Sequence, residues 1–273
     1  QSGCFGPEPE TLAAAVVGEL DGPVLAICPG VEYAEQFAED VNLLQPGLAC
    51  HFPPLETLPG DRELPNEAIV KARLSVLRHL VFGTEGGGGG EFLEPEPGTR
   101  LVCASINAML QSVCDRAALE GGARTVAVGQ EVGPHELVEW LVESGFYSAP
   151  QVTQPGQYSL RGGILDVFSH GTERPVRVEF FGERVDSIRT FDRATQLSHG
   201  RVQSWQLVAA GDPLADPTVG DASLFSYLPD DAAVLIVEPA HTWQRAGELA
   251  GSTEAGGMFL SPGQVRDALQ ERP

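Results

Sequence analysis

Short apolar runs alternate with helical patterns over the first 115 residues of the chain. Residues 24–28 form an apolar run between Gly-Pro and Pro-Gly pairs, and residues 101–104 form another, as in strands buried on both faces. Residues 32–43 predict a helix, and Asn66 is the expected N-cap of a second helix. The apolar face of that second helix is formed by Val70, Leu74, Leu77 and Val81. This alternation is typical of βα units, so we expect the helix after Asn66 to lie on a sheet.

A different pattern begins at Arg124. It predicts a strand at residues 125–128, one amphipathic helix at 135–144 and a nearly all-β stretch from 152 to 208. These elements indicate a separate, small α+β domain.

The βα pattern returns after a connector rich in Pro and Asp that follows Asp212. It predicts a strand at 233–237, a helix at 242–250 and a strand at 258–260. This return indicates that the β-rich domain is inserted into, or sits astride, one α/β domain. The expected parts are residues 1–121, 122–212 and 213–273.

The candidate binding residues lie on the strand predicted at residues 176–181 and on its neighbour at 157–161. Because side chains alternate across a strand, Val176, Val178 and Phe180 are expected to be buried. The other face carries Arg177, Glu179 and Phe181. Gly182 suits the first position of a two-residue hairpin turn, which leaves Phe181 in solvent at the hairpin end. On the neighbouring strand, Arg161 points away from Tyr158 and Leu160.

An exposed aromatic side chain flanked by arginines is typical of protein-binding hot spots, so this face is predicted to dock a protein. The pattern leaves a second interpretation open, in which a neighbouring loop covers Phe181 and the arginines pair with Glu179 or Glu183. In that case the face would be an ordinary solvated surface.

The formal charge of −21 argues against a duplex-binding protein, because such proteins present a basic patch that neutralises phosphates. The charge is uneven along the chain. Residues 156–210 hold seven arginines against six acids, about +1, while the remainder holds −22. The docking strand therefore lies in the least acidic part of the chain.

Catalytic signatures are not found in the sequence. Lys71 is the sole lysine and follows Val70 in a helical pattern, so no G-x-x-x-x-G-K-[ST] phosphate loop (Walker A) is formed. The nearest glycine-containing stretch, residues 3–11, has prolines and carboxylates where N–H donors and a cation are needed. Glu238 at a strand end resembles a Mg²⁺-holding acid but has no phosphate loop as its partner. We expect neither enzymatic activity nor a cofactor.

The five cysteines are expected to be small buried hydrophobes, and no metal site is assigned. No apolar stretch has the roughly 20 residues that a membrane span requires, and the first residues show no basic segment followed by an apolar one. We therefore expect a cytoplasmic protein without a membrane partner, and the abrupt ends suggest a fragment of a longer one.

Several segments resemble the UvrB-homology module of the bacterial transcription-repair coupling factor (Mfd) family. The specific ones are Gly-Gln-Tyr-Ser-Leu-Arg-Gly-Gly-Ile-Leu-Asp-Val-Phe at 156–168, then 176–181 and 186–192. Residues 55–61 and 73–77 are also similar to that family. Two departures are a glycine run at 86–90, expected to be an added flexible loop, and a shortened connector after Asp212.

The resemblance implies a degenerate helicase-like, RecA-like α/β domain without a phosphate loop. It is split into parts like UvrB domains 1A (1–121) and 1B (213–273), with an intervening α+β domain like UvrB domain 2 (122–212) that binds UvrA. By position, the UvrA-binding residues would be Arg161, Arg177 and Phe181.

The resemblance also implies a non-catalytic role in nucleotide excision repair. ATP-dependent translocation, DNA binding and RNA polymerase binding would belong to domains absent from this chain. In the full-length protein, intramolecular masking of the docking face by the C-terminal part is a further implication. The alternatives are a UvrB-like helicase fragment with its own nucleotide site and a domain that binds DNA directly.

Overall fold

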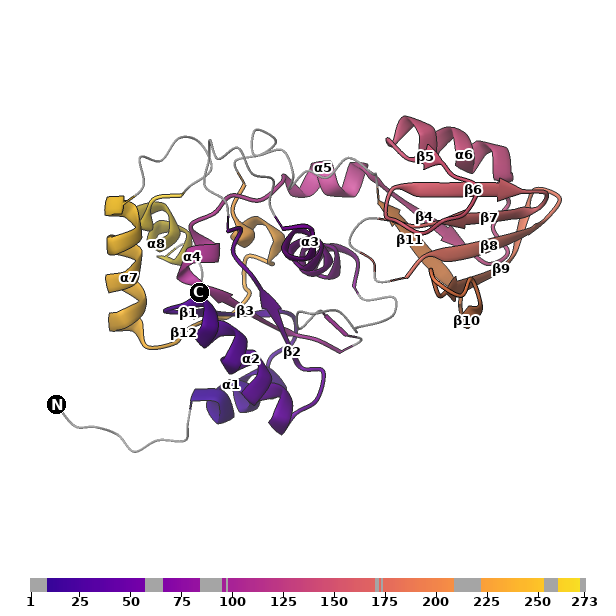
Figure 1. Cartoon of the computed structure of the whole chain (residues 1–273). Coiled ribbons are helices and arrows are strands. Elements are labelled where there is room, and N and C mark those ends of the chain that lie inside the picture. Colours follow the sequence, from indigo (N-terminus) through magenta and orange to yellow (C-terminus); the bar gives the residue numbers. More distant parts are fainter. Residues whose placement is uncertain are drawn as a thin grey trace. The chain divides into compact units, whose positions relative to one another are not determined.

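The structure is a computed structural model that describes residues 9–56, 66–83, 95–96, 98–169, 172, 174–208, 222–252 and 260–270. The chain divides into two compact units, one formed by Gln1–Arg116 with Leu214–Pro273 and the other by Ala117–Pro213 (Figure 1). The glycine run at 86–90 and the connector after Asp212 up to residue 221 lie outside the described residues.

The first unit contains a four-stranded parallel sheet with the strand order β12-β1-β3-β2. The strands are β1 (Val24–Cys28), β2 (Ala49–Phe52), β3 (Leu101–Ser105) and β12 (Val234–Ile236). Every residue of β1, β2 and β3 is buried. This confirms the two expected strands, β1 and β3, as covered on both faces, whereas β2 was not predicted. Residues 258–259 of the expected last strand lie outside the described residues, and Leu260 is not in a strand.

The helices of the first unit are α1 (Pro9–Glu19), α2 (Val31–Leu44), α3 (Glu67–Phe82), α4 (Ile106–Met109), α7 (Pro239–Ser252) and α8 (Pro262–Gln270), with a 3₁₀ turn η1 (Leu224–Tyr227). Helices α2, α3 and α4 pack on this sheet, and the other helices of the unit pack on them or on one another. The N-cap prediction is confirmed, because the Asn66 side chain accepts a hydrogen bond of 2.9 Å from the Ala68 amide. The helix that follows packs on β2, as expected. Among the described helices, none is long and apolar enough to cross a membrane.

The second unit is built on a six-stranded sheet with the order β10-β9-β8-β7-β6-β5. Its pairs are antiparallel except β5 with β6, and β4 and β11 form a separate antiparallel pair. The strands are β4 (Ala123–Ala127), β5 (Tyr147–Ser148), β6 (Gln157–Arg161), β7 (Ile164–Val167), β8 (Val176–Phe181), β9 (Arg184–Phe191), β10 (Ser198–Val202) and β11 (Ser204–Val208). The predicted strand-rich segment is confirmed.

One face of the six-stranded sheet forms the core of the second unit. Val176 and Val178 of β8 pack there with Leu137 and Leu141 of α6 (Pro134–Glu143), and Trp205 of β11 joins them. Helix α5 (Arg116–Gly121) precedes β4 in the chain. The opposite face of β6 to β9 is free to carry polar side chains, and it is where the candidate site lies.

Together the two units make a mixed α/β protein with one parallel and one mainly antiparallel sheet. The α/β class and the intervening α+β unit agree with the sequence analysis at this level. The helicase-like identity of the first unit and the match of the parts to UvrB domains 1A, 2 and 1B stay predictions.

Candidate protein-docking site

Strand register places the candidate residues on one face of the sheet. Asp166 of β7 lies opposite Arg177 of β8, and Arg177 lies opposite Arg189 of β9. Residues opposite one another in a sheet point to the same face, so an acid and two arginines form a row across three strands. Arg161 of β6, opposite Ile164, lies in the next row of the same face.

The centre of the face is an ion cluster around Asp166, whose side chain is completely buried. Arg177 donates two hydrogen bonds to this carboxylate, from Nε to Oδ1 at 2.7 Å and from Nη2 to Oδ2 at 2.9 Å. Arg161 donates from its own Nη2 to Oδ2 at 3.0 Å. These bonds to Asp166 raise the pKa of Arg177 above its usual value, since they stabilise the charged guanidinium.

The two arginines differ in exposure. The Arg177 side chain is 19% exposed, and its guanidinium carbon lies 4.8 Å from the centre of the buried Phe191 ring, a cation–π distance. The Arg161 side chain is 57% exposed and makes one bond to Asp166. Arg161 therefore presents most of its donors to solvent, while Arg177 is held against the sheet.

Phe181 stands at the end of the β8–β9 hairpin and is 85% exposed, as predicted. The turn is the two-residue Gly182-Glu183 link, and Gly182 has a φ of +66°, which a glycine adopts without strain. Ile164, on the outer face of β7, is 38% exposed. The open interpretation in which a loop covers Phe181 is therefore wrong.

The arginine pairing of that second interpretation is also not found for Arg161 and Arg177. Neither Glu179 nor Glu183 pairs with Arg161 or Arg177 among the described ion pairs, because Asp166 takes both arginines. Glu179 instead accepts hydrogen bonds from Arg189 at 3.0 Å and from the Ser187 hydroxyl at 2.7 Å.

Sequence reasoning missed Asp166 as a site residue. The signal was a single acid inside the otherwise apolar run Ile164-Leu165-Asp166-Val167. Phe180 was expected to be buried and is half-buried, packed against the core of this unit.

The described residues contain no group of three or more His, Cys, Asp or Glu that could hold a metal ion. Cys28, Cys50, Cys103 and Cys114 are free and buried, as expected for small hydrophobic residues. Burial raises the pKa of the Cys28 thiol to about 12, so it stays protonated and unreactive at neutral pH.

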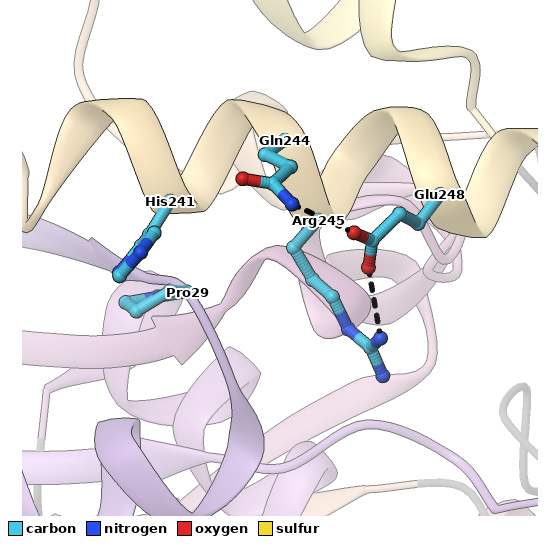
Figure 2. A pocket seen from close by; sticks show the side chains of 5 residues that line it. All are labelled: Pro29, His241, Gln244, Arg245 and Glu248. Carbon is cyan, nitrogen blue, oxygen red and sulfur yellow. Dashed lines mark hydrogen bonds and ion pairs between the residues drawn. The ribbon is translucent and has the colours of Figure 1, made fainter.

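A shallow pocket of about 250 Å³ lies beside α7, lined by Pro29, His241, Gln244, Arg245 and Glu248 (Figure 2). Its charges are satisfied within the chain, because Glu248 accepts from Arg245 at 3.2 Å and from Gln244 at 3.0 Å. The Oε2 atom of Glu238, the strand-end acid considered above, lies 2.8 Å from Nδ1 of His241. Lys71 lies within α3. These groups do not form a phosphate-binding arrangement.

Comparison with known proteins matches the second unit to a described domain. The family model of the UvrB interaction domain matches residues 125–212. The transcription-repair-coupling factor of Escherichia coli (strain K12) is 27% identical over 92% of this chain and 20% of its own length. That of Myxococcus xanthus is 34% identical over 74% of this chain and 16% of its own, and that of Haemophilus influenzae is 29% identical over 75% and 17%.

The chain spans about a fifth or less of the length of these relatives. The matched domain contains the whole of the candidate face, from Arg161 to Arg189. Residues 125–212 therefore belong to the UvrB interaction domain family, within a chain that is homologous to the transcription-repair-coupling factors over most of its length.

Proposed function

We propose that this chain is a non-catalytic docking module that binds UvrA through the outer face of β6–β8 and so recruits the excision-repair machinery in transcription-coupled repair. One observation carries the proposal. The residues matched by the UvrB interaction domain include an 85% exposed Phe181 on the same outer face as the arginines that pair with Asp166. Exposed aromatic and arginine side chains are the residue types that dominate binding energy at protein interfaces.

The contacts follow from the geometry of the face. Phe181 would fill an apolar pocket on UvrA, with the partly exposed Ile164 at its side. Arg161 and Arg177 would donate charge-assisted hydrogen bonds to carboxylates of UvrA. Arg177 already commits Nε and Nη2 to Asp166, which leaves Nη1 for the partner, whereas Arg161 commits only Nη2.

The first unit would serve as a degenerate helicase-like scaffold without nucleotide chemistry. Support comes from Lys71, which lies within α3 rather than after a phosphate loop, and from the internally paired charges of the pocket beside α7. Translocation along DNA, RNA polymerase binding and masking of the docking face would then depend on parts of the full-length protein beyond this chain.

Two calorimetric titrations of the 273-residue chain test the proposal. Titration with purified UvrA should give saturable binding, and titration with ATP and Mg²⁺ should give no heat of binding. The variant Arg161→Ala/Phe181→Ala should lose UvrA binding while keeping its thermal unfolding temperature, because both side chains are mostly exposed. Heat with ATP and none with UvrA would instead support the alternative of a UvrB-like fragment with its own nucleotide site.

A further inference from the structure

Asp166 has an unusual position for an acid on a docking face. Its side chain points to the same outer face as Arg177, its cross-strand neighbour, and yet its exposure is 0%. The carboxylate is bonded on that face by the guanidinium groups of Arg161 and Arg177. The acid is therefore covered by the two arginine side chains that, in the proposed function, bind the partner.

The bonds to Asp166 restrict both arginines. The two hydrogen bonds to Asp166 fix the plane of the Arg177 guanidinium. The guanidinium carbon also lies 4.8 Å from the centre of the Phe191 ring, a cation–π contact that further restricts the group. Arg161 donates to the same Oδ2 atom that Arg177 uses, so one carboxylate oxygen holds both guanidiniums beside each other. Free arginine side chains would lose conformational entropy when a partner immobilises them, and ordering them in advance reduces that loss.

We infer that Asp166 is a positioning residue of the docking site, which holds Arg161 and Arg177 in the arrangement that receives an acidic side chain of the partner. This inference rests on the proposed function. Two guanidiniums around one carboxylate carry one net positive charge, so the cluster fits one carboxylate of the partner. With Phe181 and Ile164 alongside, the matching surface on UvrA is a single acid next to an apolar pocket.

The second ion cluster on the same face shows what a pair without this role looks like. Glu179 and Arg189 form one monodentate contact at 3.0 Å, and their side chains are 27% and 29% exposed. In that pair both side chains stay partly exposed to solvent. A buried ion pair is by itself weak evidence for stability, so the full burial of Asp166 under two arginines is better explained by preorganisation.

The variant Asp166→Asn tests the inference, because it keeps the shape of the side chain and removes the charge that orders the arginines. We expect UvrA affinity to fall about 10-fold or more. Asp186→Asn is the matched control: it makes the same change in charge on β9 of the same sheet, where Asp186 is exposed, and should leave affinity within about two-fold. If Asp166 had only an electrostatic effect, its removal would strengthen binding to an acidic partner. Unchanged or tighter binding by Asp166→Asn overturns the inference.

A double-mutant cycle separates positioning from general stability. In an Arg161→Ala/Arg177→Ala background, Asp166→Asn should cause no further loss of affinity, because the groups through which Asp166 acts are gone. A further loss of the same size in that background would show that Asp166 acts through the fold instead. Urea unfolding of each variant measures the effect on stability alone.

A measurement on the unmodified chain covers the case in which Asp166→Asn does not fold. Nitrogen-15 relaxation of the Arg177 Nε–H group should show a rigid side chain before UvrA is added as well as after it. A mobile Arg177 that becomes ordered only on binding overturns the inference. If the unmodified chain fails to bind UvrA, the proposed function fails; if it binds and Phe181→Ala weakens binding while Asp166→Asn does not, only the inference fails.

Discussion

Phe181→Ala is the cleanest perturbation of the docking face, because the structure separates its effect on binding from its effect on folding. The side chain is 85% exposed in the free chain, so truncation removes little packing and should change the free energy of unfolding by less than about 0.5 kcal/mol. Burying a phenylalanine from this state stabilises a complex by about 2–3 kcal/mol. At about 1.4 kcal/mol per factor of ten, the dissociation constant for UvrA should rise roughly 30- to 150-fold.

Isothermal titration of UvrA into the unmodified and substituted chains measures this change, and thermal unfolding verifies the fold. Leu43→Ala is the matched control, since Leu43 is 82% exposed but lies on α2 in the first unit. It should bind UvrA as the unmodified chain does. An affinity of Phe181→Ala within two-fold of the unmodified chain would refute the assignment of the hairpin end as the contact.

Three further predictions concern charged groups. Arg161→Ala should weaken UvrA binding about 10-fold and lower the free energy of unfolding by less than about 1 kcal/mol, because the side chain is 57% exposed. Arg193→Ala removes another exposed arginine and should change neither affinity nor stability. Equal losses of affinity in the two variants would contradict this prediction. Arg73 is completely buried and donates to the Pro53 carbonyl, the Gln111 side chain and the Ser112 carbonyl. Arg73→Met should therefore lower the free energy of unfolding in urea by about 3 kcal/mol, and a loss under about 1 kcal/mol would contradict a stabilising role of these bonds. Burial lowers the pKa of His51 from 6.5 to about 4. As the pH falls from about 6.5 to about 4, the unfolded chain therefore protonates His51 while the folded chain does not, and the free energy of unfolding should decrease over this range. Relative to His51→Leu the fall should be about 3 kcal/mol, and equal pH slopes for the two chains would refute it.

Local patterns were sufficient for much of the fold. The Asn66 cap acts on an amide two residues away, and the helix that follows has its own apolar period, so both could be predicted from neighbouring residues. The same holds for Phe181. Alternation along β8 and a glycine at the first turn position are properties of eight consecutive residues, and they place the ring in solvent without reference to other strands.

The partners of the arginines depended on tertiary structure. Arg161, Asp166 and Arg177 come from three strands, and only the register of β6 with β7 and of β7 with β8 brings one carboxylate between two guanidiniums. The sequence left open a pairing of the arginines with Glu179 or Glu183, which are close to Arg177 along the chain, whereas Arg161 and Arg177 both pair with Asp166 on a neighbouring strand. The sequence by itself determined that an aromatic residue and arginines share an outer face. The tertiary structure decided that a buried aspartate holds those arginines, because ion pairing across strands depends on register and burial rather than on distance along the chain.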